Sequence, residues 1–355
     1  MRNNLFTYAT SELSQDAFIC WCANWHNDDS KPKLRELSHR FISLLSDIKE
    51  ISSVAVYRQF NKIDVLLVVN DTTAIIVEDK TFTSEHDNQI SKYNQILHKL
   101  LGKSGFLEIG GNRHKISDIK SVYLKTGNLY PEDEANANLD DVIIITRKDM
   151  LSLLEDFVNE SEIVRDYRDN LMELDRWYSD CEAQYINGEY EKAFASNYGQ
   201  LYCIKDLFGG KMVGAFSEKD ILIEPGSSFG RPFTWAWLWG RSNWYWIGYR
   251  VDCDENGYFL SLKQYRNYKS SDSKDIIAKE KSEMFYYLRS EIGRLLEDLP
   301  LNGIIGGNRA GYNESELCKF YFKDNDIRLL RKHLIPLAGQ AIASYSEKHT
   351  LNDLH

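Results

Sequence analysis

The spacing of apolar residues changes along the chain and predicts where helices and strands form. In the first 160 residues, apolar positions recur at helical spacing in some segments and form short runs rich in β-branched residues in others. We expect helices over 11–26, 33–49, 85–101 and 147–158, and strands over 53–60, 65–69, 73–77, 119–124 and 142–145. Strands and helices in this order predict an α/β domain over residues 1–160.

The second and third of these strands are close enough in sequence to form a β-hairpin. Asn70 and Asp71 supply turn chemistry between them. Asp64 opens the first strand of the hairpin, and its partner depends on the register. A strict two-residue loop pairs Asp64 with Val77, whereas an extra loop residue or a bulge pairs it with Glu78. We favour the pairing with Glu78.

Charged residues gather where the hairpin strands meet. The sequence Glu78-Asp79-Lys80 closes the second strand, and alternation along a strand places Glu78 and Lys80 on one face while Asp79 points away. Two carboxylates beside a mostly apolar hairpin are costly unless a cation neutralises them. Oxygen ligands suit Mg2+, for which Mn2+ can substitute, and such an ion activates water and binds phosphate oxygens.

These residues resemble the motif of the PD-(D/E)XK nuclease superfamily. In that motif an Asp at a strand start is followed by an acid, any residue and a Lys at the end of the next strand, as in Asp64, Glu78 and Lys80. Gln89 and Tyr93 follow on one helical face, which is similar to the RecB-like and lambda-exonuclease-like branch. A capping box at 84–87 marks the start of that helix.

The resemblance extends upstream to Glu12, which is similar to the first-helix acid of the same branch. It implies a restriction-endonuclease-like core of helix, three strands, helix and strand, and a Mg2+-dependent nuclease that acts on DNA in phage defence, restriction or repair. It also implies that Asp64, Glu78 and Glu12 bind the metal, that Lys80 handles the attacking water or the phosphate charge, and that Glu12, Gln89 and Tyr93 assist catalysis.

Ordinary structural roles are the alternatives for the same residues. The hairpin end can be a solvated salt bridge, and Glu12 can be an acid that interacts with the helix dipole. Tyr93 can be a core residue and Gln89 a surface residue.

The second half of the chain has a different composition. We expect a charged helical connector over 161–195 and an α+β domain over 196–355 with an aromatic-rich antiparallel sheet. One hairpin predicts a tryptophan ladder, with Trp239 opposite Trp244 and Trp237 opposite Trp246. Such a ladder can stack nucleobases or pack as core.

The strand after this ladder interleaves basic and aromatic residues. Those residues are Lys263, Tyr265, Arg266, Tyr268 and Lys269, and a nucleic-acid face is one interpretation of them. No catalytic constellation is visible in this half, so we expect a recognition, regulatory or oligomerisation module that binds a protein partner or a second copy of the chain.

Composition narrows the classes of protein that remain. Six cysteines without a Cys-x-x-Cys pair indicate a reduced protein, and the absence of a signal peptide and of a long apolar stretch predicts a cytoplasmic protein without a membrane partner. The net charge of -10 argues against a surface that coats nucleic acid broadly, although a metal site is itself acidic. A non-catalytic binding protein on a nuclease fold and a small-molecule phosphohydrolase are therefore the alternatives to a nuclease.

Overall fold

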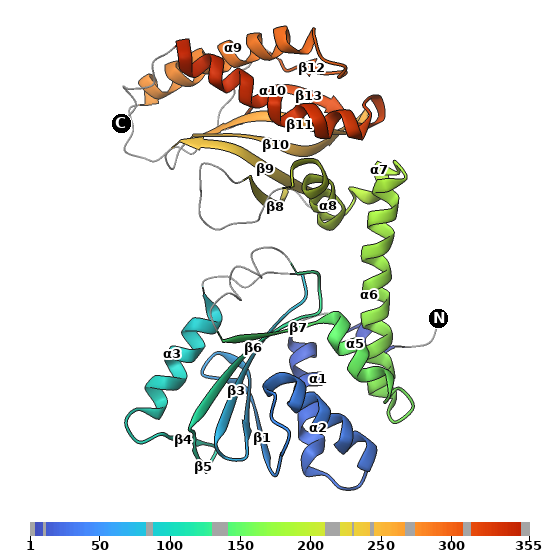
Figure 1. Ribbon diagram of the computed structural model, residues 1–355, viewed down its shortest axis with the longest axis vertical. Helices are drawn as coiled ribbons and strands as arrows, with labels where there is room; N and C mark the ends of the chain where they lie inside the picture. The colour runs from blue at the N-terminus through green and yellow to red at the C-terminus, as the bar shows by residue number, and fades with distance from the viewer. Residues whose placement is uncertain are drawn as a thin grey trace. The chain divides into compact units, whose positions relative to one another are not determined.

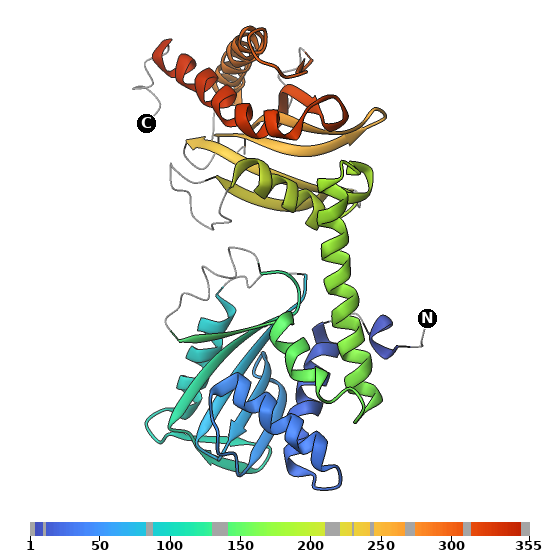
Figure 2. The same ribbon diagram turned by 45° about the vertical axis from the view of Figure 1, so that its right-hand side comes forward.

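The chain folds into two compact units. The computed structural model describes residues 4–9, 12–82, 88–129, 141–209, 221–228, 231–241, 245–266, 274–307 and 314–348. The units comprise Met1–Trp177 and Tyr178–His355, coloured blue to green and green to red in Figure 1. Their boundary falls inside helix α6, Glu162–Ile186, within the predicted connector (Figure 2).

A five-stranded mixed sheet forms the centre of the N-terminal unit. Its strands are β1 (Val54–Phe60), β2 (Ile63–Val69), β3 (Thr73–Lys80), β6 (Asp118–Lys125) and β7 (Val142–Thr146). They lie in the order β1-β2-β3-β6-β7; the β1–β2 and β2–β3 pairs are antiparallel, and the β3–β6 and β6–β7 pairs are parallel. The predicted mixed α/β class is confirmed for this unit.

Helices cover both faces of the sheet. One face carries α1 (Glu12–Asn24), α2 (Pro32–Ser46), α5 (Arg147–Glu155) and the first half of α6, and the other carries α3 (Gln89–Leu101). Alternate residues of β2 enter different cores: Val65 and Leu67 face α1 and α2, whereas Leu66 faces α3. Burial on both faces explains why the sequence of these strands is continuously apolar.

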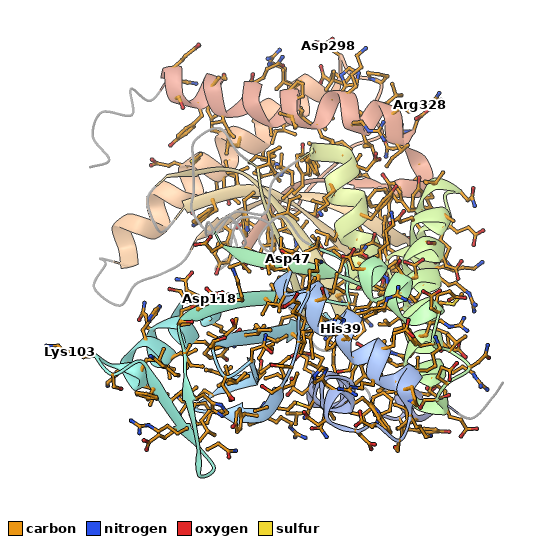
Figure 3. All side chains as sticks on the ribbon, turned by 60° about the horizontal axis from the view of Figure 1, so that its bottom comes forward. His39, Asp47, Lys103, Asp118, Asp298 and Arg328 are labelled. Atoms are coloured by element: carbon orange, nitrogen blue, oxygen red, sulfur yellow. The ribbon has the colours of Figure 1, made fainter. Side chains whose placement is uncertain are left out.

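The basic and glycine-rich composition of segment 102–117 predicts a loop, and the structure shows this prediction to be wrong. It contains a second hairpin, β4 (Phe106–Ile109) and β5 (Asn112–Lys115), which turns at Gly110-Gly111 with positive φ at both glycines. Side chains of this unit are drawn in Figure 3, where Lys103 marks the turn after α3 and Asp118 the start of β6. The short strands and basic residues hid the hairpin pattern.

The register of the β2–β3 hairpin follows the favoured prediction. Its loop has three residues, two of which, Asn70 and Asp71, have φ of 56°. The Asn70 side chain accepts hydrogen bonds from the backbone N–H and the hydroxyl of Ser52, which fixes the loop to the chain before β1. Val65 pairs with Val77, so the next position outward sets Asp64 opposite Glu78.

The C-terminal unit contains the expected aromatic-rich antiparallel sheet. Its order is β12-β13-β11-β10-β9-β8, and every neighbouring pair is antiparallel. The strands are β8 (Leu222–Ser228), β9 (Arg231–Arg241), β10 (Tyr245–Asp254), β11 (Gly257–Arg266), β12 (Ile304–Ile305) and β13 (Glu314–Tyr321). The helices are α7 (Tyr190–Ala193), α8 (Asn197–Phe208), α9 (Lys274–Leu296) and α10 (Ile327–Lys348).

The predicted tryptophan ladder has the wrong register. Trp237 pairs with Gly248, and Trp246 pairs with Gly240, because β9 continues to Arg241 and contains an extra residue, Leu238, opposite the Ile247–Gly248 step of β10. A Cβ atom at Gly248 would lie 2.6 Å from the Ala236 carbonyl oxygen, so this position requires glycine. The Trp237 and Trp246 rings still approach to 5.7 Å, whereas Trp244 lies outside the described residues.

Candidate active site

Acidic and basic side chains converge at the end of β3. Glu78 is fully buried, and its Oε1 lies 2.5 Å from the Lys80 Nζ, which is also buried. Asp64 stands opposite Glu78 across the β2–β3 pair and lies near enough to influence the pKa of Glu78. The structure therefore brings together the three residues of the acid-acid-lysine motif.

The remaining predicted residues come from two helices. Glu12 begins α1, and its Oε2 lies 3.7 Å from the Lys80 Nζ. On α3, the Gln89 side chain donates a hydrogen bond to the Tyr93 hydroxyl at 3.4 Å. Tyr93 is buried close enough to Glu78 for that charge to affect its pKa. The capping box predicted at 84–87 lies outside the described residues.

Three further polar side chains of this site were not predicted. Asp79, expected only to point away from Glu78, is 1% exposed and packs towards α1. The Gln15 Nε2 donates to the Asp79 Oδ2 at 2.8 Å, and Asp16, which is 2% exposed, lies near enough to raise the pKa of Asp79. Single carboxylate oxygens of Asp16, Asp79 and Asp64 all lie within 4.8 Å of one another.

A helical spacing in α1 carries the signal for the missed residues. Glu12, Gln15 and Asp16 are three and four residues apart, so they lie on one face of the helix. The same face holds two buried polar residues in an otherwise apolar segment. Recognising them as site residues requires knowing that this face packs on the end of β3.

Burial dominates the protonation behaviour of the acids. Desolvation raises the pKa of Glu78 to about 8, and the neighbouring Asp64 carboxyl adds to the shift against the lowering effect of Lys80. Burial and the contact with Asp16 likewise raise the pKa of Asp79 far above its ordinary value. Burial and the nearby charge of Glu78 raise the pKa of Tyr93 to about 12, so its hydroxyl stays protonated.

Lys80 responds in the opposite sense. Its burial lowers its pKa, but the hydrogen bond and charge of Glu78, with help from Glu12 and Asp64, outweigh that effect and raise the pKa above its ordinary value. The ammonium group therefore remains charged at neutral pH. A permanently charged group suits stabilisation of an anion better than removal of a proton from water.

The donor set fits a divalent cation. Asp16 Oδ1 and Asp79 Oδ1 are buried acceptors, and within the described chain neither receives a hydrogen bond from a donor. Two buried carboxylate oxygens without donors require a proton or a cation between them. Asp64 lies between this pair and Glu78, so it belongs to two neighbouring groups of oxygen ligands.

Residues that follow β6 and residues of α5 and α6 fix the Gln15 side chain. The Thr126 hydroxyl donates to the Gln15 Oε1 at 2.8 Å, and the Tyr167 hydroxyl from α6 donates to the same oxygen at 3.3 Å. Arg147 at the start of α5 donates to the Thr126 carbonyl oxygen at 2.8 Å. Gln15 is thus held in one orientation, with its amide nitrogen directed at Asp79.

Basic side chains near the site are available to a ligand. Arg58 pairs with Val65 across β1 and β2, next to Asp64, and Lys62 precedes β2. Both are exposed, and neither forms an ion pair with another residue of the described ranges. They add local positive charge to a chain whose net charge is -10.

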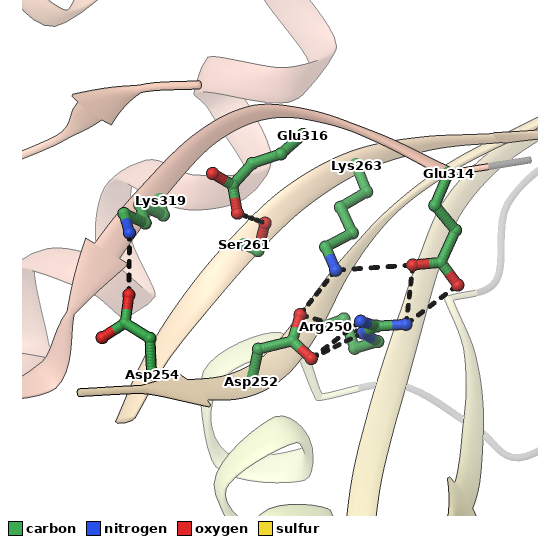
Figure 4. Close-up of polar contacts among 8 residues, drawn as sticks. All are labelled: Arg250, Asp252, Asp254, Ser261, Lys263, Glu314, Glu316 and Lys319. Carbon is green, nitrogen blue, oxygen red and sulfur yellow. Dashed lines mark hydrogen bonds and ion pairs between the residues drawn. The ribbon is translucent and has the colours of Figure 1, made fainter. Parts of the chain in front are cut away.

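The structure describes the side chain of one basic residue of the predicted nucleic-acid face, Lys263, and this residue is paired with acids. The Lys263 Nζ lies 2.6 Å from the Asp252 Oδ2, and Arg250 donates to both Asp252 and Glu314 (Figure 4). The Arg266 side chain and residues 268–269 lie outside the described part of the chain. This network pairs two cations with two acids, so it offers little attraction to phosphate.

Comparison with known proteins assigns no relative to the chain. No family model matches it, and neither a curated protein nor a solved structure shows significant similarity. Among the helices of the described residues, none combines the length and hydropathy of a membrane span.

Proposed function

We propose that the chain is a metal-dependent hydrolase of phosphodiester bonds, with DNA as the expected polymer. The observation that carries this proposal is a buried, charged Lys80 held between Glu78 and Glu12 beside Asp64. A surface salt bridge is exposed and contributes little to stability. Lys80, by contrast, is 5% exposed and Glu78 is 0% exposed. Burying these charges is costly and is expected where function requires it.

The order of elements supports the same proposal. Helices α1 and α2, the antiparallel strands β1–β3, helix α3, the β4–β5 hairpin and the parallel strand β6 follow one another in the chain. Apart from the extra helix and the hairpin, this order is compatible with the core that the resemblance to PD-(D/E)XK nucleases implies, and Asp64, Glu78 and Lys80 lie on its strands β2 and β3. Fold resemblance alone does not determine activity, so the argument rests on the side chains.

The proposed metal ligands are Asp64 and Glu78, with Glu12 at the open side of the site. Asp16 and Asp79 supply further oxygen ligands around the shared Asp64. A bound Mg2+ would supply a more acidic water and neutralise charge on the phosphate. The chain binds it in competition with protons, because Glu78 must lose its proton to become a ligand.

The other side chains act on the phosphate and on one another. Lys80 places a fixed positive charge where negative charge develops on the phosphate. Gln89 donates a hydrogen bond to the Tyr93 hydroxyl on α3, and this protonated hydroxyl would orient the metal ligand Glu78 or a bound phosphate. Arg58 and Lys62 hold the flanking phosphates of the polymer.

A panel of substrates tests this proposal against its alternatives. Purified protein is incubated with linear duplex DNA, circular duplex DNA, single-stranded DNA and free nucleotides, each with Mg2+, Mn2+ or a chelator. We expect cleavage of a polymer with either metal and none with chelator, and the circular substrate separates endonuclease from exonuclease activity. Hydrolysis of nucleotides alone would instead indicate a small-molecule phosphohydrolase, and binding without hydrolysis would indicate a binding protein.

A further inference from the structure

A cavity of about 310 Å3 lies in the N-terminal unit next to the proposed site. Its lining is mostly apolar and aromatic, with a few polar groups, and it includes Gln15, Phe82, Thr126, Tyr167, Asn170 and Trp177. The volume is at the lower end of the range for small-molecule pockets. It therefore suits one small planar group and not a duplex.

Two lining residues connect the cavity to the carboxylates. The Gln15 amide nitrogen donates to Asp79, while its oxygen accepts from Thr126 and Tyr167. Thr81, which directly follows Lys80, also lines the cavity and contacts the Thr126 hydroxyl at 3.0 Å. A ligand in the cavity would thus contact Gln15, whose amide nitrogen reaches Asp79 of the proposed site.

Two exposed aromatic rings stand at this cavity. Phe82 is 60% exposed and Trp177 is 39% exposed, and their ring centroids are 6.5 Å apart in an edge-to-face arrangement. Large apolar groups exposed together contribute little to the folded core and are typical of interaction sites. Their π-faces can stack on any nucleobase.

A polar group accompanies the aromatic rings. The Asn170 side chain lines the cavity, is half-buried, and forms no hydrogen bond with another residue of the described ranges. Its amide offers both donors and an acceptor. A planar ligand with a polar edge, as a nucleobase has, would satisfy the rings and the amide together.

We propose that this cavity binds one unpaired nucleobase of the substrate, adjacent to the phosphate that is cleaved. This inference rests on the proposed function and specifies its substrate as a strand with at least one unstacked nucleotide near the site. Bases inside a duplex are stacked and cannot enter, so frayed ends, overhangs or single strands are the preferred forms.

Binding to designed DNA ends tests the inference separately from cleavage. Fluorescence anisotropy in chelator measures the affinity for three duplexes that differ at one end: blunt, with a one-nucleotide overhang, and with the same overhang lacking its base. We expect the base-bearing overhang to bind at least about fivefold more tightly than the other two. Equal affinity for the overhangs with and without the base would overturn the inference.

Variants assign the preference to the two rings. Phe82→Leu and Trp177→Ala should abolish the preference, Phe82→Tyr should retain it, and Tyr286→Ala, an exposed aromatic residue of the other unit, should leave it unchanged. Both positions are exposed, so we expect the variants to remain folded, and thermal unfolding checks this. If Phe82→Leu and Trp177→Ala both still preferred the overhang that carries the base, these rings would not be the binding site.

The two proposals can fail separately. If the protein cleaves DNA with Mg2+ but ignores the unpaired base, the cavity assignment is wrong and the proposed hydrolysis stands. If it prefers the unpaired base through Phe82 and Trp177 but cleaves nothing, the cavity is a nucleobase site and the proposed hydrolysis is wrong.

Discussion

At the scale of single residues, the hairpin context predicts the acid-acid-lysine group and misses its neighbours. Asp64, Glu78 and Lys80 stand at the ends of recognisable strands, so strand alternation and turn length place them together. Asp79 was set aside because it points to the other face. That face is covered by α1, and the buried contact with Asp16 depends on helix packing that no local pattern specifies.

The raised pKa of Glu78 predicts how stability depends on pH in the metal-free protein. The folded pKa of about 8 exceeds the ordinary value of 4.5, so the folded state holds a proton that the unfolded state has lost. The stabilisation is complete below pH 4.5 and is lost as pH rises to 8, at up to about 1.4 kcal/mol per pH unit. Asp79 adds a second contribution of the same sign.

Urea unfolding in chelator between pH 5 and pH 8 measures this effect. We expect the free energy of unfolding to fall with pH in the wild type and to fall less steeply in Glu78→Gln. Glu36→Gln, at an exposed carboxylate of α2, is the matched control and should keep the wild-type slope. An unchanged slope in Glu78→Gln would show that Glu78 is already ionised.

At the scale of elements, apolar periodicity predicts the order of helices and strands well where segments are long. The helices α1, α2 and α5 and the strands of the first sheet lie near their expected ranges. Short strands with polar residues, β4 and β5, were missed. The register of β9 and β10 was also wrong, because the extra residue in β9, opposite Gly248, depends on how Trp237 packs across the sheet.

The bulge predicts a specific sensitivity to substitution. Gly248→Ala adds a Cβ atom 2.6 Å from the Ala236 carbonyl oxygen and 2.9 Å from the Trp237 ring, and backbone must move to admit it. We expect a loss of about 1–3 kcal/mol in the free energy of unfolding of this unit. Thermal or denaturant unfolding measures it. Gly307→Ala, where nothing lies within 4 Å of the added atom, should change stability little; equal effects would contradict the packing argument.

At the scale of the whole molecule, the chain is acidic but presents cations beside the site. Part of α6 beyond the predicted domain end at 160 also belongs to the first unit, since Val164 and Leu171 enter its core and Tyr167 reaches Gln15. Sequence patterns predicted that helix but not its packing. The net charge of -10 does not reveal where DNA could bind, because it averages over the whole chain. The exposed Arg58 and Lys62 are visible as a local positive group only in the structure.

Arg58 and Lys62 predict the salt dependence of DNA binding. If each contacts one phosphate, the slope of log affinity against log salt concentration should become shallower by about 1 for each residue replaced by Ala. Anisotropy titrations at several salt concentrations measure the slopes. Lys103→Ala, beyond the far end of α3 from Gln89, should leave the slope unchanged. An unaltered slope in the Arg58→Ala, Lys62→Ala double variant would place DNA elsewhere.

The central claim is that Glu78 and Lys80 carry metal-dependent hydrolysis, and the rate of DNA cleavage with Mg2+ tests it most directly. The rate is compared for the wild type, Glu78→Ala, Lys80→Ala and a matched exposed pair from α2, Lys33→Ala and Glu36→Ala. We predict that each active-site variant loses at least about 100-fold in rate, whereas the α2 variants retain it. Cleavage that persists at the wild-type rate in Glu78→Ala or Lys80→Ala would contradict the account.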